Sequence, residues 1–301
     1  MALDLAVVPV AGLGTRLLPA TKSQPKEMLP VGRRPVVQYV VEELRESGIK
    51  RILFVTGYGK SSIEDFFDVN QQLVSHLRHS GKEEQLAELA FERNQVQYAY
   101  TRQREQLGLW HAVLIGEPFV GNQPFVVALG DSIIGMHAKS RIVERMIEEY
   151  ERSNADVVVC FEELENKNEV VNYGIAQPKG QITGDVFELE SLVEKPSVDE
   201  APSNLAVAAR YVFSPAIFSE LEKTERGKGG EIQLTDAMCQ VLKKGGKGIG
   251  IRLPKEEPRF DIGNFESYFQ AFVDFALSDP QFGEGLEIYL RKKLSIEPGA
   301  E

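Results

Sequence analysis

A glycine turn follows directly after the first apolar segment of the chain, and positive charge gathers around it. Residues 5–10 form a continuous apolar run, typical of a strand that is buried on both faces. Gly12 and Gly14 follow, and because they lack side chains they let the backbone turn sharply and bring its N–H groups close to a ligand. The stretch from position 5 to position 26 has no acid but three basic residues: Arg16, Lys22 and Lys26. In a chain with a formal net charge of -11, this local excess of positive charge predicts a phosphate-binding site.

The glycine spacing differs from the two most familiar phosphate-binding motifs. A dinucleotide-binding fingerprint needs a third glycine where this chain has Leu17, which disfavours a dehydrogenase. The P-loop pattern G-x-x-x-x-G-K-[ST] is absent from the sequence. Instead, Arg16 stands two residues after the second glycine, and Pro19 and then Pro25-Lys26 follow.

Length and composition limit the class of protein. A chain of 301 residues, 43% hydrophobic and 26% charged, is typical of a soluble globular protein of one or two domains. Its acidic balance argues against nucleic acid and against anionic membrane surfaces as partners. The N-terminus lacks the features of a signal peptide, and no apolar run approaches a membrane span. Because Cys160 and Cys239 are the two cysteines, we expect no disulfide framework and a cytoplasmic location.

Segments with strand and helix character alternate along the first half. Strands are expected at residues 5–10, 51–55, 96–100, 125–129 and 156–161. Helices are expected from Pro35, from Ser61, over 139–152, and in a charged excursion over 70–93 that breaks near Gly81. This order predicts a parallel, doubly wound sheet. The second half adds strands at 173–177, 186–193 and 205–213 and helices at 231–242 and 264–277. We therefore expect a Rossmann-like α/β fold with a mixed, mostly parallel sheet flanked by helices.

Two aspartates are candidate metal ligands. Asp131 follows the apolar strand at 125–129, and ligands of open α/β sheets bind outside the carboxyl ends of the strands. Asp261 stands at the entry to a helix. With a triphosphate bound, such carboxylates would hold Mg²⁺, which prefers oxygen ligands, although a helix N-cap or a turn is the alternative role for each. The run Asp131-Ser132-Ile133 is no Asp-x-Asp motif, which weighs against a metal-dependent glycosyltransferase with a UDP-sugar donor.

The tripeptide Glu194-Lys195-Pro196 follows another apolar strand. Pro196 is expected to hold Lys195 in an extended conformation and so to fix its direction. A lysine is a compact point charge that suits a phosphate monoester, and Glu194 can accept hydrogen bonds from sugar hydroxyls. A salt-bridged strand end is the alternative interpretation of the tripeptide.

Together these motifs resemble the signature of the sugar-1-phosphate nucleotidyltransferases. The pattern Gly-x-Gly-Thr-Arg-x-x-Pro with Pro25-Lys26 resembles the family signature, and Glu27-Met28-Leu29-Pro30 narrows the resemblance to the bacterial UTP–glucose-1-phosphate uridylyltransferases. Similar elements follow in the family's order over nearly the whole chain: Tyr39-Val40-Val41, Gln103, Gly108-Leu109, His111-Ala112, Asp131, Tyr173-Gly174, Glu194-Lys195-Pro196, residues 201–205, Arg210-Tyr211, residues 231–236 and Gly263-Asn264. Two departures, Arg104 and Trp110, stand where the family has glycine, near the segment that recognises the base.

The resemblance implies a role for each residue of this chain that matches a binding or catalytic position of the family. The residues that would hold the nucleotide phosphates are Ala11, Gly12, Gly14, Thr15, Arg16 and Lys26. Those that would lie at the base are Glu27, Gln103 and Gly108. Gly174, Glu194 and Lys195 would hold the sugar phosphate, Asp131 the Mg²⁺, and Asp261 matches a second metal ligand of related enzymes. Arg16, Lys26, Asp131 and Lys195 would be the catalytic residues.

The resemblance also implies the reaction and the organisation of the chain. The expected activity is transfer of UMP from UTP to α-D-glucose 1-phosphate, giving UDP-glucose and pyrophosphate with Mg²⁺. The expected fold is the nucleotide-diphospho-sugar transferase fold as one domain over residues 1–301. Residues of about 1–130 would form the nucleotide half and 131–265 the sugar-phosphate half, before C-terminal helices and a tail at 266–301. A homodimer or homotetramer is expected.

Two alternatives stay open from the sequence. One keeps the reaction but uses dTTP or another sugar 1-phosphate. The other is a catalytically silent protein that binds a sugar nucleotide, against which the joint presence of Arg16, Lys26, Asp131 and Lys195 argues. No general base is apparent and none is required, since a phosphate monoester with a second pKa of about 6 is largely dianionic at pH 7.

Overall fold

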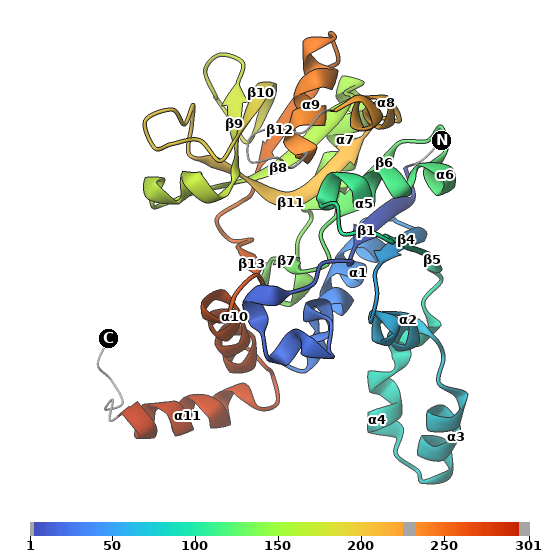
Figure 1. Cartoon of the computed structure of the whole chain (residues 1–301). Coiled ribbons are helices and arrows are strands. Elements are labelled where there is room, and N and C mark those ends of the chain that lie inside the picture. The colour runs from blue at the N-terminus through green and yellow to red at the C-terminus, as the bar shows by residue number, and fades with distance from the viewer. Residues whose placement is uncertain (1–2, 225–232, 295–301) are drawn as a thin grey trace.

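The first half of the chain forms four parallel strands at one side of a nine-stranded sheet (Figure 1). The computed structural model describes residues 3–224 and 233–294. In order across the sheet, these four strands are β5 (Gln97–Arg102), β4 (Arg51–Thr56), β1 (Leu5–Pro9) and β6 (Phe125–Ala128). Pro9 is the last residue of β1, so its missing N–H interrupts no ladder within the sheet.

The second half continues the same sheet. Beyond β6 follow β11 (Leu205–Phe213), β8 (Val157–Glu163), β12 (Gly248–Arg252), β10 (Val186–Glu194) and β9 (Gly174–Pro178). In this sheet of the described residues, β10 and β11 run opposite to the other strands. Strand β9 also pairs with β11, which curls this side of the sheet. The expected mixed, mostly parallel α/β fold is confirmed.

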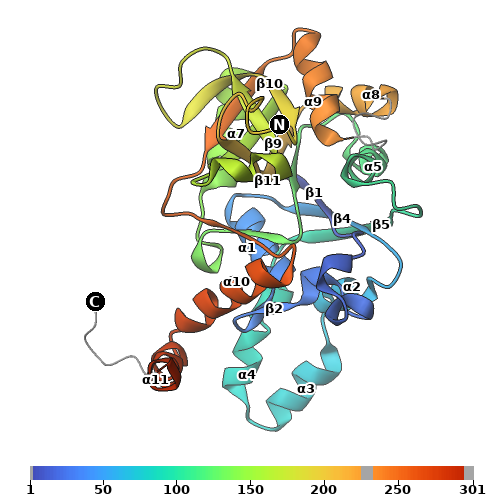
Figure 2. The ribbon, with the colours of Figure 1, turned by 60° about the vertical axis from the view of Figure 1, so that its left-hand side comes forward.

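Helices cover both faces of the sheet (Figure 2). One hydrophobic cluster packs the sheet against α1 (Val36–Glu46), α2 (Ser61–Phe67) and α7 (Ile142–Ser153). The other packs it against α5 (Leu109–Ile115), α6 (Glu117–Val120), α8 (Ala216–Lys223) and α9 (Leu234–Lys243). Because strands such as β1 and β6 are buried on both faces, their sequences are continuous apolar runs rather than alternating ones.

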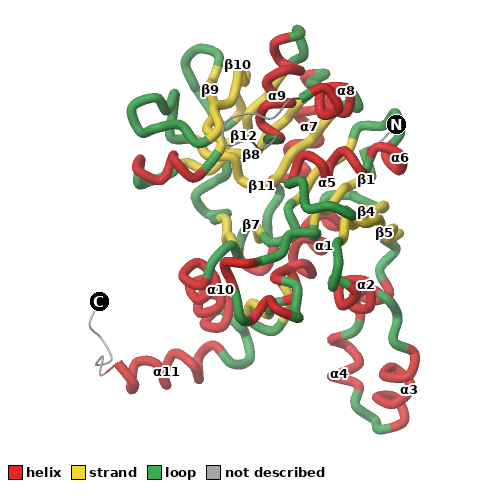
Figure 3. Tube along the Cα trace, viewed as in Figure 1, coloured by secondary structure: helices red, strands yellow, loops and turns green. Residues whose placement is uncertain are grey.

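Two segments project from this layered body (Figure 3). The charged excursion forms α3 (Gln71–His79) and α4 (Glu83–Glu88), and the break falls at Gly81, whose φ is +65°. At the carboxyl end lie α10 (Phe265–Leu277) and α11 (Gly283–Leu294). The first residues of the helix expected at 231–242, and the tail at 295–301, lie outside the described residues. In the part of the chain that the structure describes, no helix is both long and apolar enough to cross a membrane.

Two small sheets complete the fold next to the carboxyl ends of β1 and β6. Strand β7 (Ser132–Ile134) pairs antiparallel with β13 (Arg259–Asp261), and β2 (Pro30–Val31) pairs with β3 (Arg34–Pro35). A third hydrophobic cluster, which includes Leu17, Tyr39 and Phe275, fixes α10 against this region. The β7–β13 pair, the β2–β3 pair and the packing of α10 therefore all support the polypeptide around the carboxyl ends of the parallel strands.

Candidate active site

The glycine turn leaves the carboxyl end of β1 in a conformation that its sequence explains. Gly14 has a φ of +66°, a left-handed backbone that glycine adopts without a steric penalty. A Cβ at this position would also lie 3.2 Å from the Thr21 side chain, whose hydroxyl donates a hydrogen bond of 2.7 Å to the Gly14 carbonyl. Thr15 and Arg16 are exposed, so their polar groups are available to a ligand.

Lys26 and Asp131 form a short ion pair between the turn and the end of β6. Their side chains are 16% and 19% exposed. Burial works against the charged form of Lys26, but the carboxylates of Asp131, Glu27 and Asp261 outweigh it and raise the pKa of the ammonium. Burial likewise opposes ionisation of Asp131, yet the Lys26 ammonium holds the pKa of this carboxyl below its ordinary value. Both groups are therefore charged at neutral pH.

The pairing of β7 with β13 brings the second aspartate to the first. Ser132 stands opposite Asp261 in the register, and the Ile262 N–H donates a hydrogen bond of 2.9 Å to the Asp131 carbonyl. Burial and then the nearby negative charge of Asp131 raise the pKa of the Asp261 carboxyl. Two carboxylates that repel each other at one buried place favour a cation between them.

The donor set at this place suits Mg²⁺. Magnesium sites that also engage substrate phosphates use one or two protein carboxylates, and Asp131 with Asp261 supplies that number. Within residues 3–224 and 233–294, no group of three or more His, Cys, Asp or Glu side chains could hold a metal ion. The chain thus offers a partial coordination shell rather than a closed cage.

A cavity of about 220 Å³ opens beside the Lys26–Asp131 pair. Predicted site residues line it from several elements: Ala11, Gly12, Lys26, Glu27, Gln103, Gly108 and Asp131. Gln103 is 4% exposed, and its side-chain nitrogen lies 2.9 Å from the Gly108 carbonyl and 3.2 Å from His111 Nδ1. Larger hollows of about 560 and 870 Å³ lie elsewhere, but neither contains a residue that the sequence predicted to bind nucleotide.

Glu27 lies in this cavity wall but does not present a free carboxylate to it. The side chain is 1% exposed overall and forms an ion pair of 2.8 Å with the Lys60 ammonium. Burial raises the pKa of the Glu27 carboxyl, and the Lys60 and Lys26 charges oppose that shift. Glu27 therefore joins Lys60 to the wall of the cavity.

The residues expected to bind the sugar phosphate cluster at the β9–β10 end of the sheet. Glu194 accepts a hydrogen bond of 2.9 Å from the Thr235 hydroxyl. A Cβ at Gly174 would lie 2.9 Å from Thr235 Cγ2 and 3.2 Å from Glu194 Oε2, so only glycine lets these side chains meet. Lys195 is 55% exposed, and its ammonium lies 3.8 Å from Glu194.

The expected conformation of Lys195 is wrong. Its φ is +44°, which is left-handed rather than extended, and its N–H donates a hydrogen bond of 2.9 Å to the Tyr173 carbonyl. This tertiary hydrogen bond outweighs the local preference of a residue that precedes proline. Left-handed backbone at a non-glycine residue occurs often at binding sites, where the surrounding structure enforces it.

Arg259 connects the sugar-phosphate cluster to the two aspartates. Its guanidinium lies 5.3 Å from the centre of the Tyr173 ring and pairs with Glu162. Its positive charge opposes the effect of burial on the pKa of both Asp131 and Asp261, although the pKa of Asp261 stays raised. Among the described residues, Lys195 itself contacts Glu194 and Tyr173 rather than the Lys26–Asp131 pair.

Comparison with known proteins decides the family. A family model described as nucleotidyl transferase matches residues 5–277. The UTP–glucose-1-phosphate uridylyltransferase YngB of Bacillus subtilis strain 168 is 45% identical over 292 residues, which cover 97% of this chain and 96% of that protein. The chain belongs to the nucleotidyl transferase family.

Solved structures agree with this membership. A UTP-bound UGPase from Acinetobacter baumannii matches this nucleotidyl transferase with a TM-score of 0.88 at 37% identity, over 98% of this chain and 100% of that one. A UDP-glucose pyrophosphorylase complexed with UDP-glucose matches with a TM-score of 0.80 at 36% identity, over 91% of this chain and 98% of that one.

Sequence reasoning missed two residues of this nucleotidyl transferase site. Lys60 pairs with Glu27, and Gln106 lines the cavity, with its side-chain nitrogen 3.2 Å from where a Cβ of Gly57 would lie. The signal for Lys60 was a second glycine turn, Gly57-Tyr58-Gly59-Lys60, which follows β4 as the first turn follows β1. No local pattern distinguishes Gln106 from other exposed loop residues.

The two residues that depart from the family pattern stand outside the cavity lining. Arg104 is exposed, and Trp110 is half-buried on α5 against the hydrophobic cluster that includes Val113. The Trp110 ring would lie 3.5 Å from a Cβ at Gly108. The indole therefore packs on the hydrophobic cluster and does not line the cavity.

The backbone at Gly108 provides a test of how the pocket is built. With a φ of +95° and a ψ of -177°, the position is in a region that only glycine adopts without strain. We expect Gly108→Ala to lower the free energy of unfolding by about 1–3 kcal/mol in urea titrations. Gly184→Ala, where a Cβ meets nothing within 4 Å and φ is not positive, should change it by less than about 0.5 kcal/mol. Equal effects at both positions would contradict this account of the loop.

Proposed function

We propose that this nucleotidyl transferase transfers UMP from UTP to α-D-glucose 1-phosphate, giving UDP-glucose and pyrophosphate. The observation that carries the proposal is the Lys26–Asp131 pair, which lines the same cavity as Gln103 and Gly108 and lies close to Asp261. The names of relatives that align over nearly the whole chain support it, as do the UTP and the UDP-glucose in the matching solved structures.

In the proposed complex, two groups of residues hold the two substrates. The N–H groups of residues 11–16, with Arg16 and Lys26, bind the triphosphate, while Gln103 and the backbone at Gly108 lie at the base. Gly174 and Glu194 contact the sugar hydroxyls, and Lys195 binds the phosphate of glucose 1-phosphate. This assigns residues of about 1–130 mainly to the nucleotide and 131–265 mainly to the sugar phosphate.

The chemistry requires positioning and charge neutralisation rather than a base. A phosphate oxygen of glucose 1-phosphate forms a bond to the α-phosphorus of UTP. The bond from that phosphorus to the α–β bridging oxygen breaks, and pyrophosphate leaves with the electron pair. Because both reactants are anions, Arg16, Lys26 and Lys195 align them and reduce their repulsion.

Asp131 and Asp261 would hold the Mg²⁺ that the family implies. When bound, the ion neutralises charge on the triphosphate oxygens and on the leaving pyrophosphate. Lys26 then has a second role, because the ammonium that pairs with Asp131 can contact a substrate phosphate instead. Both cysteines, Cys160 and Cys239, are free thiols, which fits a reaction in the cytoplasm.

The metal assignment of Asp131 can be tested by one substitution. Asp131→Asn keeps the size of the side chain but removes its charge, so we expect the protein to fold and pyrophosphate release to fall by about a hundredfold or more. The exposed Asp199→Asn is the matched control and should keep full activity. Normal turnover of Asp131→Asn at limiting Mg²⁺ would show that Asp131 does not hold the metal.

Lys195 should act on one substrate more than on the other. Loss of its charge-assisted contact predicts that Lys195→Ala raises the KM for glucose 1-phosphate about tenfold or more and changes the KM for UTP far less. Lys179→Ala, an exposed lysine that pairs with Glu188 on the same β9–β10 hairpin, is the control. Equal changes for the two substrates would remove Lys195 from the sugar-phosphate site.

Trp110 tests the choice of nucleotide, because an indole replaces the family's glycine there. Since the ring packs on the hydrophobic cluster, we expect Trp110→Gly to lower Tm while the ratio of kcat/KM for UTP over dTTP stays in favour of UTP. Trp110→Phe should recover most of the stability. An unchanged Tm together with a severalfold change in that ratio would place the indole in the base pocket and favour the dTTP alternative.

We also propose a homodimer or homotetramer, as the family resemblance implies. Helices α10 and α11 expose large apolar side chains: Phe269, Phe272, Val273, Leu277, Ile288 and Tyr289. Covering them in an oligomer removes this apolar surface from water. Light scattering should therefore report a mass at least twice 33.6 kDa, and a single species of 33.6 kDa at working concentration would contradict the proposal.

A further inference from the structure

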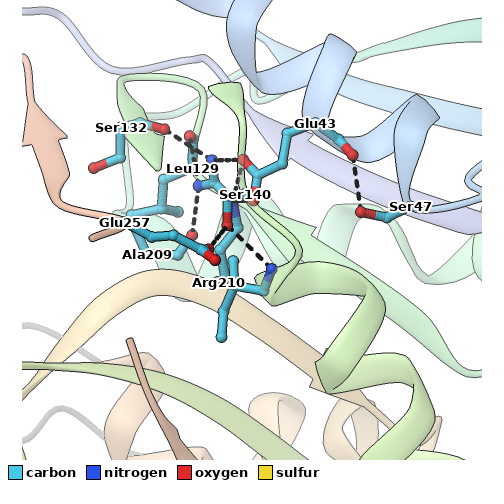
Figure 4. A network of polar contacts seen from close by, with 9 residues as sticks. Glu43, Ser47, Leu129, Ser132, Ser140, Ala209, Arg210 and Glu257 are labelled. Atoms are coloured by element: carbon cyan, nitrogen blue, oxygen red, sulfur yellow. Dashed lines mark hydrogen bonds and ion pairs between the residues drawn. The ribbon is translucent and has the colours of Figure 1, made fainter. Parts of the chain in front are cut away.

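Arg210 is an arginine with no exposed surface, and it forms an ion pair with an equally buried glutamate. Its guanidinium lies 2.6 Å from Glu43 Oε2 through Nη2, and Nε lies 3.2 Å from each of the two carboxylate oxygens. Glu43 stands on α1 and is 1% exposed, whereas Arg210 stands on β11, so the pair joins a helix to the centre of the sheet (Figure 4). Burial raises the pKa of the Glu43 carboxyl, and the Arg210 charge opposes that shift.

The remaining donors of Arg210 bind the loop that carries Asp131. Nη2 donates a hydrogen bond of 2.9 Å to the Ser132 carbonyl, and Nη1 makes a longer one of 3.5 Å to the Leu129 carbonyl. These two carbonyls flank the dipeptide Gly130-Asp131 on either side. One rigid, planar guanidinium therefore fixes both ends of the loop between β6 and β7.

The backbone of β11 is distorted at the same place. Ala209 has a φ of +60°, and the pairing of β11 with β8 shifts register between Val207 and Tyr211. The Ala209 carbonyl accepts hydrogen bonds of 3.0 Å from Arg210 Nη1 and 3.1 Å from the Leu129 N–H. Strain at a non-glycine residue persists where surrounding contacts enforce it, and here those contacts lead to the Asp131 loop.

We propose that the Glu43–Arg210 pair is a positioning device for the metal ligand Asp131. Arg210 supplies the hydrogen bonds that fix the loop, and Glu43 supplies the charge that allows a buried arginine. Stability alone does not account for the pair, because apolar residues of similar volume replace a buried ion pair with little loss. The inference rests on the proposed function, in which Asp131 holds Mg²⁺.

The decisive variant removes the ion pair without leaving a buried charge. Glu43→Leu with Arg210→Met should fold with a Tm near that of the unaltered protein, but the carbonyls of Leu129 and Ser132 lose their donors. Val40→Ala is the matched control, because it opens a cavity on the same helix and leaves the Arg210 contacts in place. Two readouts apply to the full chain: Mn²⁺ binding by electron paramagnetic resonance, and hydrogen exchange of residues 129–134 by mass spectrometry.

We expect the double variant to bind Mn²⁺ about tenfold more weakly or worse, the loss typical when residues that orient a metal ligand are removed, and to exchange faster over residues 129–134. Val40→Ala should change neither. Unaltered Mn²⁺ affinity in the double variant, or an equal loss in Val40→Ala, would overturn the proposal.

Two further variants keep the proposal testable. If the double variant does not fold, Arg210→Lys keeps the pairing charge but cannot reach both carbonyls. It should weaken Mn²⁺ binding in the same way, and normal binding would overturn the proposal.

Asp131→Asn in the same titration separates the metal role of Asp131 from the positioning role of the Glu43–Arg210 pair. Normal Mn²⁺ binding there rejects the metal role of Asp131 itself. Weak binding there with normal binding in the double variant rejects the positioning role alone.

Discussion

The site depends on an electrostatic constraint at the carboxyl end of β6. Asp131 and Asp261 are brought together where both are partly buried, and the two carboxylates repel each other. Lys26 offsets part of this repulsion by pairing with Asp131, and Arg259 and Arg16 lie close enough to act on Asp261. The arrangement places two carboxylates close to the positive side chains of Lys26, Arg16 and Arg259. Both halves of the chain are needed to build it, because β13 comes late in the chain and the glycine turn comes first.

Two buried ion pairs connect the segments that carry Lys26 and Asp131 to the surrounding fold. Lys60 pairs with Glu27, the neighbour of Lys26, and Arg210 pairs with Glu43 below the loop of Asp131. The first pair links the turn after β4 to the helical turn of residues 26–28, and the second links the interior of β11 to α1. Because a buried charge that loses its partner is strongly unfavourable, such pairs permit few alternative positions of the loops that they join. The side chains of Arg16 and Lys195 are exposed and take part in neither of these buried pairs.

Sequence patterns predicted the features that depend on interactions between residues close together in the sequence. The apolar run of β1, the left-handed turn at Gly14 and the helical periodicity of α1 each depend on residues a few positions apart, so the fold class and the glycine turn could be predicted from the sequence. The approach of Asp261 to Asp131 depends on the pairing of strands more than a hundred residues apart, which periodicity does not encode. For the same reason, the tertiary hydrogen bond that turns Lys195 left-handed, and the partners of Glu27 and Arg210, were outside the reach of sequence reasoning.

The central claim is that this arrangement of charges joins a nucleotide to a sugar phosphate with UTP and glucose 1-phosphate as the preferred pair. The most direct measurement is the initial rate of pyrophosphate release for a matrix of nucleoside triphosphates against sugar 1-phosphates, each with Mg²⁺ and with excess chelator. The account predicts the highest kcat/KM for UTP with glucose 1-phosphate, and no release when the metal is removed. A higher value for another pair, or no release with any pair, would contradict it.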